Sequence, residues 1–341
     1  MNMVNPFLKC LYGTSELSRF PAIQYRMNRK PLSLCLALVC ACTILFSCKK
    51  DKSPGPNPNP GEIRLSGIEM KSGGNSYRYI LQYDNLGRIE KVSHASNDEP
   101  GTTLFNVTYE ANDIILTRPM HEDPSIQIMD TIRFSLDLDG NVRSRLQYRY
   151  VKSIAPNGDE SRTYIHDTTV CEYNAEGLLT NLMHNLQDST WTFANGGNES
   201  KKVLRKMELA DYIIEGSKLS FINRRGDVSE TTYTGGNTTI VATIEEAVIE
   251  FDYAKAYQNK IDFSNAAVLN ELHAFTDLPL NKNFAYLPNT VHTTKTRKNM
   301  DGVIFSTTSV SAQNDFTFNA DGYVVSKEDS GNPGTKVMYW Y

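Results

Sequence analysis

Alternation of apolar and polar positions dominates the chain from residue 62 onward. Near the start of this stretch, Tyr77, Tyr79, Leu81 and Tyr83 occupy every second position. A period of two is typical of a β-strand with one face in an apolar environment, because successive side chains of a strand point to opposite faces. Similar runs recur to the end of the chain and predict about 14 to 16 strands.

A recurring turn motif separates these strands. Its fullest copy is Tyr83-Asp84-Asn85-Leu86-Gly87-Arg88-Ile89, with Asp or Asn three residues before a glycine and a branched apolar residue two after it. The Asp or Asn side chain can cap its own backbone, glycine tolerates a positive φ, and the apolar residue restarts a strand. The motif predicts hairpin turns at Gly87, Gly140, Gly177, Gly226, Gly302 and Gly322.

One segment departs from the strand pattern. Ser264 can cap a helix that runs through Phe275, with Val268, Leu269 and Leu272 on one apolar stripe. We expect this stripe to plug or cover an end of the sheet. Because the hairpins leave no room for crossover helices, the predicted fold is all-β: an antiparallel β-meander, either barrel-like or an open curved sheet, with one late helix.

The N-terminal residues predict export and anchoring. Arg29 and Lys30 precede a mainly apolar run that ends in Leu45-Phe46-Ser47-Cys48, which resembles a bacterial lipobox. The run is shorter than the roughly 20 apolar residues of a transmembrane helix. We therefore predict four segments: a mis-started extension (1–26), a signal peptide (27–47), a lipidated Cys48 with a Pro/Asn-rich tether (48–61) and one β-meander domain (62–341).

The predicted lipid anchor indicates a protein held at the outer membrane of a Gram-negative envelope, with the membrane as its first partner. Cys48-Lys49-Lys50-Asp51 partly matches a surface-export signal, so the cell surface and the periplasmic face both stay open. The proline-rich tether predicts an extended spacer between the membrane and the folded domain.

Composition narrows the function further. The chain has a net charge of -4 and an isoelectric point of about 5.9, which argues against a nucleic-acid partner. Of its six cysteines, only Cys171 follows the predicted lipidation site, so neither a disulfide nor a cysteine metal site is expected in the folded part. Cys171 lies in an alternating run and is interpreted as a small core residue.

No motif for catalysis or cofactor binding emerges. The histidines are dispersed, and the serine-nucleophile elbow, phosphate loop and dinucleotide fingerprint are missing. The run Asp137-Leu138-Asp139-Gly140-Asn141 is reminiscent of a calcium loop, but it lacks the bidentate glutamate and coincides with a predicted turn. We therefore predict no catalytic residues, no metal and no cofactor.

Three function classes stay open. The first is a non-enzymatic binding or scaffold module for a glycan or a protein, in which Trp191 and Trp340 could stack on sugar rings. The second is an envelope glycan hydrolase, because the two carboxylates of such enzymes meet only in three dimensions. The third is a pore or a lipid-carrying open barrel, which the alternation and the aromatic last residue, Tyr341, would fit.

Two resemblances bear on these classes. The first motif copy, residues 83–89, looks like the YD repeat of Rhs-type toxin shells, but the uneven intervals between copies and the chain length argue against such a shell. The whole order of features is similar to Bacteroides-type lipoproteins with a domain of unknown function described as porin-like: the lipobox, tether, hairpins, the Ile261-Asp262-Phe263-Ser264 entry to the helix and the late motif 316–324. This resemblance implies a many-stranded barrel-like domain and brings no catalytic residues.

Overall fold

The computed structural model describes part of the chain, and all of that part belongs to one compact unit, Pro56–Tyr341. The predicted extension, signal peptide, Cys48 and tether lie outside the described residues. No helix in the described part is both long and apolar enough to cross a membrane. The described residues are 64–72, 74–96, 101–120, 123, 125–194, 199–216, 218–253, 257–258, 260, 265–272, 286–329 and 336–341.

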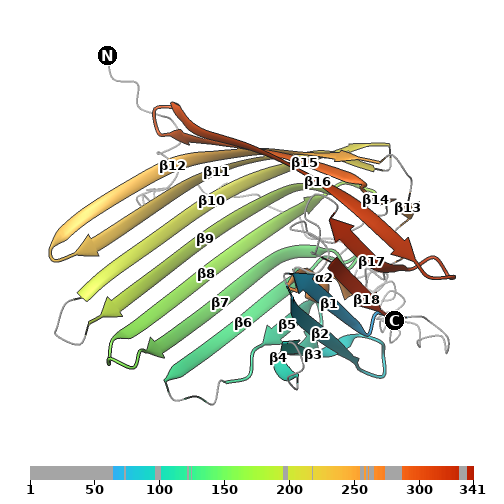
Figure 1. The fold of residues 1–341 in the computed structure, drawn as a ribbon, viewed down its shortest axis with the longest axis horizontal. Helices are drawn as coiled ribbons and strands as arrows, with labels where there is room; N and C mark the ends of the chain where they lie inside the picture. Colours follow the sequence, from blue (N-terminus) through green and yellow to red (C-terminus); the bar gives the residue numbers. More distant parts are fainter. Residues whose placement is uncertain are drawn as a thin grey trace, which may run out of the picture. The chain divides into compact units, whose positions relative to one another are not determined.

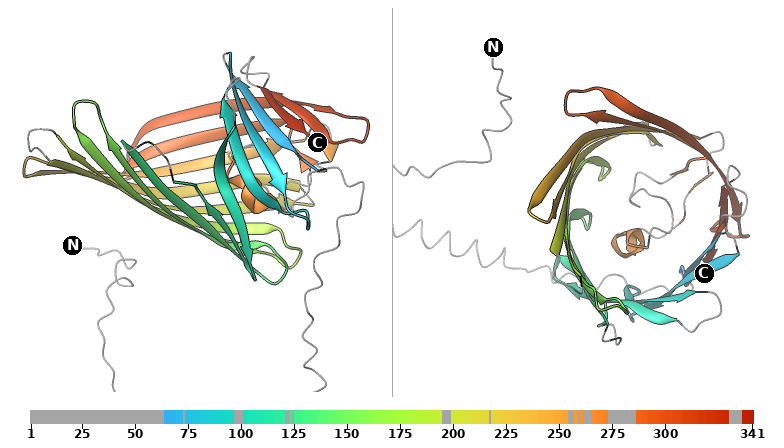
Figure 2. Two further views of the ribbon diagram at one scale, coloured as in Figure 1. Left: turned by 90° about the horizontal axis from the view of Figure 1, so that it is seen from below. Right: turned by 60° about the vertical axis from the view of Figure 1, so that its left-hand side comes forward.

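Sixteen of the described strands form one closed antiparallel barrel (Figure 2). Neighbours along the chain pair with each other, except that β12 pairs with β15, and β1 pairs with β18 to close the ring. The predicted all-β antiparallel meander is thus confirmed. Of its two predicted forms, a barrel-like sheet and an open curved sheet, the structure shows the barrel. Its strands are β1 (Gly67–Ser72), β2 (Asn75–Tyr83), β3 (Ile89–Ser96), β4 (Thr102–Glu110), β5 (Asp113–Thr117), β6 (Ile126–Leu136), β7 (Val142–Ile154), β8 (Glu160–Tyr173), β9 (Leu179–Phe193), β10 (Glu199–Glu215), β11 (Lys218–Thr234), β12 (Asn237–Asp252), β15 (Thr290–Asn299), β16 (Ile304–Phe318), β17 (Val324–Asp329) and β18 (Lys336–Trp340).

The barrel has two unlike sides. Strands β1 to β5, β17 and β18 have nine residues or fewer and form what we call the short-strand side. Strands β7 to β12 have 13 to 17 residues and form the long-strand wall. In Figure 1 the long-strand wall extends well past the short-strand side. A separate two-stranded sheet joins β13 (Tyr257–Gln258) to β14 (Tyr286–Leu287).

The late helix, α2 (Ala266–Asn270), lies inside the barrel (Figure 2). Val268, Leu269 and Leu272 are buried against apolar side chains of the short-strand side, such as Ile68 and Leu116. The expected plug is therefore present. A second apolar cluster lies on the long-strand wall and comprises Leu179, Ala210, Tyr212, Leu219, Ile222, Ile249 and Phe251.

The helix differs from the prediction in its length and its cap. Ser264 and Phe275 lie outside the described residues, and the residue that precedes the helix is Asn265. Its side chain makes no capping bond; instead, Oδ1 accepts a hydrogen bond from the Ile89 backbone N–H at 3.1 Å. The helix is thus tied to the strand that follows the Gly87 turn.

Five motif glycines lie in turns with a positive φ: Gly87, Gly140, Gly177, Gly302 and Gly322. In each of these turns, Oδ1 of the leading Asp or Asn accepts hydrogen bonds from the backbone N–H groups two and four residues later. The five acceptors are Asp84, Asp137, Asn174, Asn299 and Asn319. The side chain thus satisfies backbone donors that the hairpin leaves unpaired.

The predicted turn at Gly226 is wrong, because this glycine lies inside β11 and not in a turn. It pairs with Glu208 on one neighbouring strand and Glu245 on the other. Hydrogen bonding along both edges of this long strand overrides the local turn preference. A Cβ atom at Gly226 would lie 3.1 Å from the Met207 carbonyl oxygen, so the glycine serves a close approach of two backbones.

One further turn has the backbone hydrogen bonds of the motif turns but does not match the motif in sequence. At residues 155–159 the backbone bonds are those of the motif turns: Ala155 N–H donates to Asp159 O, and Gly158 N–H donates to Ala155 O. Ala155 stands where the motif has Asp or Asn, so no side-chain oxygen is available from that position.

Candidate functional site

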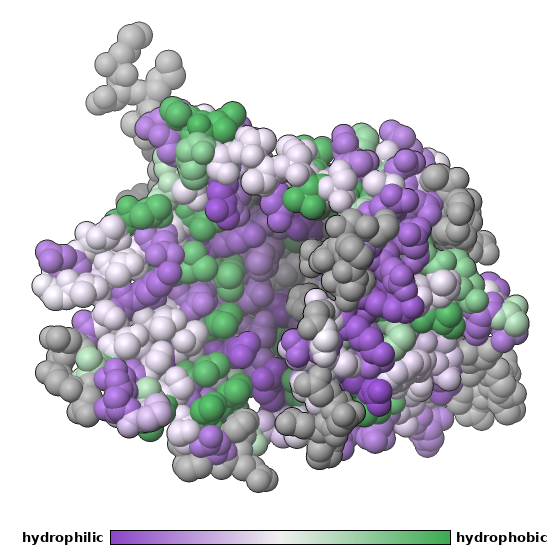
Figure 3. Space-filling model, in the orientation of Figure 1, coloured by the Kyte–Doolittle hydropathy of each residue, from purple (hydrophilic) through white to green (hydrophobic). Residues whose placement is uncertain are grey.

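The inner and outer faces of the long-strand wall carry different chemistry. Arg145 on β7 points inward, because its guanidinium binds Glu271 at the end of the internal helix. Every second residue from Arg145 therefore faces inward, and Leu146, Tyr148 and Tyr150 face outward. Figure 3 shows a hollow bounded by the two sides of the barrel, whose visible lining is mostly hydrophilic with smaller apolar patches.

A row of rings crosses the outer face of β7, β8 and β9. Tyr148 stacks with His166 at a centroid distance of 4.8 Å, and Tyr150 contacts Tyr164 at 4.9 Å. Tyr164 in turn meets the edge of Trp191 at 5.3 Å. The strand register produces the row, because Tyr148 pairs with His166 and Tyr150 pairs with Tyr164 across the same two strands.

The rings line the first part of a depression that we call the outer groove. This aromatic part has a volume of about 710 Å³, and its lining also includes Met129, Thr131, Arg149, Ile165, Gln187 and Ser189. Tyr148 is 56% exposed and Tyr164 is 46% exposed, so both rings are available to a ligand. Such rings normally become buried in a β-protein, and their exposure marks this part of the surface as a binding candidate.

The outer groove continues as a more polar part of about 430 Å³. His166 and Gln187 line both parts, so the two are contiguous. The polar part adds hydrogen-bonding side chains, namely Thr168, Asn185, Arg205, Asp227 and Ser229. Among the described residues that line the groove, Asp227 is the one carboxylate, so the lining does not supply the pair of carboxylates that glycoside hydrolysis uses.

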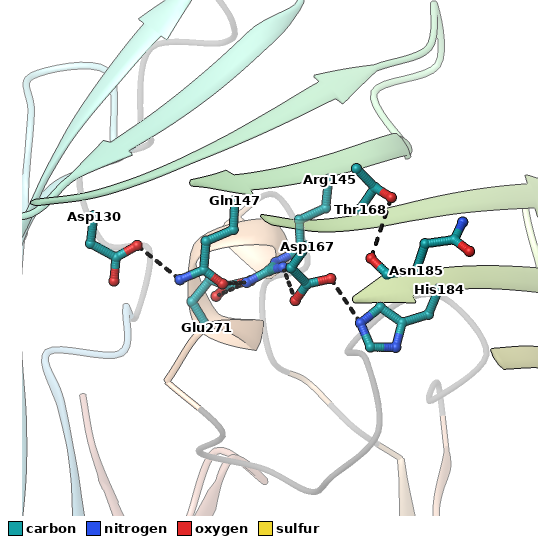
Figure 4. A network of polar contacts seen from close by, with 8 residues as sticks. All are labelled: Asp130, Arg145, Gln147, Asp167, Thr168, His184, Asn185 and Glu271. Carbon is teal, nitrogen blue, oxygen red and sulfur yellow. Dashed lines mark hydrogen bonds and ion pairs between the residues drawn. The ribbon is translucent and has the colours of Figure 1, made fainter. Parts of the chain in front are cut away.

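The inner face carries a network of charged side chains centred on Arg145 (Figure 4). Its Nε and Nη2 donate to the two carboxylate oxygens of Glu271 at 2.6 and 2.9 Å, and its Nη1 donates to Asp167 at 3.0 Å. Asp167 also contacts Nε2 of His184 at 2.7 Å. This network attaches the internal helix to the long-strand wall.

Two carboxylates of the inner face, Asp167 and Glu208, have a lowered pKa. Burial opposes the charge of Asp167, but the hydrogen bond from His184 and the charge of Arg145 outweigh it and lower the pKa of Asp167. Burial likewise opposes the charge of Glu208, and the hydrogen bond and charge of Lys206 keep its pKa low. A carboxyl with a lowered pKa is a poor general acid at neutral pH, so these groups are structural ion-pair partners.

The sequence-predicted residues fall largely outside the groove. The turn glycines lie in hairpin loops or, for Gly226, inside β11, and Cys48 lies outside the described residues. Trp191 is part of the ring row, whereas Trp340 lies on β18 with the guanidinium of Arg78 4.3 Å from its ring centroid. The described residues contain no group of three or more His, Cys, Asp or Glu placed to hold a metal ion.

Cys171 is half-buried beside the second apolar cluster. Burial raises the pKa of its thiol to about 11, which makes it a weak nucleophile at neutral pH. The sequence interpretation missed Tyr148, Tyr150, Tyr164 and His166 as a group. Their alternation was visible, but alternation does not tell which face is solvent-exposed.

Comparisons with known proteins complete the description. No family model matches the chain, and no curated protein matches it. A crystal structure of a porin-like protein from Bacteroides vulgatus ATCC 8482 aligns over 82% of this chain and 99% of its own, with 13% identity and a TM-score of 0.43. One from Bacteroides uniformis ATCC 8492 aligns over 81% of this chain and 97% of its own, with 11% identity and a TM-score of 0.38. At this sequence identity and TM-score, no residue of this chain can be assigned a role from either structure.

Proposed function

We propose that this protein is a non-enzymatic, lipid-anchored binding module of the outer envelope, and that its outer groove binds a glycan. The observation that carries the proposal is a row of rings next to a polar extension: Tyr148, His166 and Tyr164, which are exposed, and Tyr150 and Trp191, which are half-buried. The anchor part of the proposal rests on the lipobox-like residues that end at Cys48.

The groove chemistry suits a sugar chain. Pyranose rings present flat C–H faces that pack on aromatic rings, and their hydroxyl groups need hydrogen-bond donors and acceptors nearby. The groove offers both in adjacent parts, with Gln187 shared between them and Asn185 and Arg205 beyond it. The rings stand on paired strands of 13 to 15 residues, so little ordering is needed on binding.

The test uses the small number of tryptophans. In a Trp340→Phe background, Trp191 is the one remaining fluorophore of its kind, so its emission reports directly on the groove. Titration with envelope and dietary polysaccharides should quench or shift this emission for at least one glycan. Trp191→Ala should weaken binding of that glycan, measured by calorimetry, by about tenfold or more, as is usual for a central aromatic contact.

Two results would overturn the proposal. One is a glycan panel that leaves the emission of Trp191 unchanged. The other is a bound glycan whose affinity survives both Trp191→Ala and Tyr164→Ala. Release of shortened products from a bound glycan would instead favour the hydrolase class.

A membrane pore is the second candidate, and the closed sixteen-strand barrel with a hydrophilic hollow favours it. The outer face argues against it, because charged side chains such as Arg162, Arg205 and Asp227 point outward on the long-strand wall. Arginine on a lipid-facing strand costs about 2–4 kcal/mol at the bilayer midplane. Cys48→Ala separates the two ideas: an anchored module leaves the membrane fraction, whereas an integral barrel stays there after carbonate extraction.

A further inference from the structure

Two arginines converge on one carboxylate at the inner face of the barrel. Arg118 directly follows β5, and its backbone N–H donates to the carbonyl of Asp130 at 2.9 Å. Arg149 is the register partner of Asp130 on the neighbouring strand β7. The Nε atoms of Arg118 and Arg149 lie 4.0 and 3.9 Å from the same oxygen, Oδ2 of Asp130.

This arrangement leaves the Nε atom of each arginine without a hydrogen-bond partner. Both distances exceed hydrogen-bond length, and both Nε atoms are buried without a hydrogen-bond partner. Arg145 on the same wall is the contrast, because its Nε and both Nη atoms donate to protein oxygens. Buried polar atoms of a folded protein are normally paired, so two unpaired guanidinium nitrogens side by side call for an explanation.

The local charge is also unbalanced. Two cations share one carboxylate, whose other oxygen already accepts a hydrogen bond from Gln147 at 2.8 Å. Burial and the neighbouring charge of Arg149 lower the pKa of Arg118, although Asp130 acts in the opposite direction. The ring of Phe105 lies 5.4 Å from the Arg118 guanidinium and holds it from one side.

Solvent nevertheless reaches both groups. The side chain of Arg118 is 24% exposed and that of Arg149 is 35% exposed, whereas the side chain of Asp130 is 2% exposed. Part of each arginine side chain is therefore open to a small solute, whereas the carboxylate between them is not. Because Met129 faces outward and Asp130 inward, this position lies on the opposite face of the sheet from the outer groove.

We propose that Arg118 and Arg149 form an oxyanion-binding site on the inner wall of the barrel, which takes a carboxylate or phosphate group. Two planar guanidinium groups provide the paired N–H donors that such groups accept. The second anion restores charge balance, and Asp130 positions the two arginines from behind. This inference does not depend on the glycan proposal, because it uses the inward-facing side chains of Arg118, Arg149 and Asp130. Arg149 also borders the outer groove, but its guanidinium lies beside Asp130 on the inner face.

The experiment measures binding of inorganic phosphate and of acetate to the purified protein, by calorimetry and by the shift in melting temperature, at constant ionic strength with chloride as the reference. We expect millimolar binding of at least one anion, and the comparison of the two arms tells a phosphate site from a carboxylate site. Arg149→Gln and Arg118→Gln should each weaken this binding roughly tenfold or more.

Two further variants make the outcome specific. Arg205→Gln removes an arginine of the outer groove and should leave the affinity unchanged. Asp130→Asn keeps the shape of the positioning side chain and the bond from Gln147 but removes the competing negative charge, and should tighten binding roughly tenfold. Each affinity is measured on the folded fraction, so a lower melting temperature of a variant does not obscure the result.

The proposal fails if neither anion binds the wild-type protein. It also fails if phosphate raises the melting temperature equally in the wild type, Arg149→Gln and Arg205→Gln proteins, because that pattern is the general stabilisation by excluded salts. Weaker binding in Arg205→Gln alone would place the anion in the outer groove and likewise overturn it.

Discussion

The short-strand side and the long-strand wall follow the same alternation of residues but use it in opposite ways. On β4 of the short-strand side, Phe105 and Val107 are buried in the core around the internal helix. On β7 of the wall, the inward positions hold Arg145 and Gln147, and tyrosines face outward. The difference separates two tasks, because the first side supplies most of the packing and the second exposes aromatic and polar groups to possible ligands.

The contrast also explains where stability should be concentrated. Side chains that are fully excluded from water include Ile68, Ile89, Leu116 and Val268, all in the cluster around the internal helix. Burial of an aliphatic side chain contributes about 1.5–3 kcal/mol. The wall has a smaller apolar cluster near one end of its strands, and its remaining inner surface relies on ion pairs and strand pairing.

The largest effect is expected where the two regions are joined. Glu271→Gln removes one partner of a largely buried ion pair and leaves Arg145 without its bidentate acceptor. We expect a loss of about 3–5 kcal/mol in the free energy of unfolding, measured by urea denaturation. Arg162→Gln, at an outer-face pair with Glu160, is the control and should change stability little. Equal losses of stability in the two variants would mean that the Arg145–Glu271 ion pair does not hold the internal helix to the long-strand wall.

The next effect compares two leucines. Leu272→Ala opens a cavity beside the internal helix, where the side chain is 1% exposed, and should cost about 2–5 kcal/mol. Leu209→Ala changes a leucine on the outer face of β10 that is 50% exposed, and should cost about 0.5 kcal/mol or less. If urea denaturation gives similar losses for the two variants, the assignment of packing to the short-strand side is wrong.

A smaller effect should appear in acid. The pKa of Asp167 is lower in the folded protein than its unfolded value of about 3.9, so its contribution to stability is full above that value. The contribution is lost as pH falls through the folded pKa. Asp167→Asn should therefore be less stable than the wild type at pH 7 and lose less stability between pH 5 and pH 2. Leu209→Ala removes no charge and should keep the wild-type dependence of stability on pH. If Asp167→Asn also kept that dependence, Asp167 would not be an ion-pair partner in the inner network.

The smallest effect is a gain. Ala155→Asn supplies the side-chain oxygen that the other motif turns use, in a turn that already has their backbone bonds. In the wild type the Asp159 N–H donates to Oδ1 of Asn157 at 3.2 Å, so the new oxygen replaces or supplements this bond. We expect about 0.5–1 kcal/mol of added stability by thermal denaturation. Ala155→Gln carries the same amide on a longer side chain that does not reach the backbone donors, and should give no gain. A gain from both variants would point to a cause other than capping.

Much of the fold was predictable because its signals are local. Five of six motif turns have the expected positive-φ glycine, and the stripe of Val268, Leu269 and Leu272 is buried as a plug. The turn predicted at Gly226 is wrong because pairing with strands on both sides outweighs a local turn preference. The pairing of β12 with β15 joins segments separated by about forty residues, and no local pattern encodes such a contact.

By itself, the sequence determined the strands, most of their turns and the plug helix, since alternation, Asx-Gly turns and an apolar helical stripe act over a few residues. Tertiary structure alone decided that the ring of strands closes, which face of each strand meets water, and that Tyr148, Tyr164 and Trp191 form one surface. The physical reason is the symmetry of a strand: a period of two assigns residues to two faces but does not say which face is inside. That choice depends on what the opposite wall of the barrel presents.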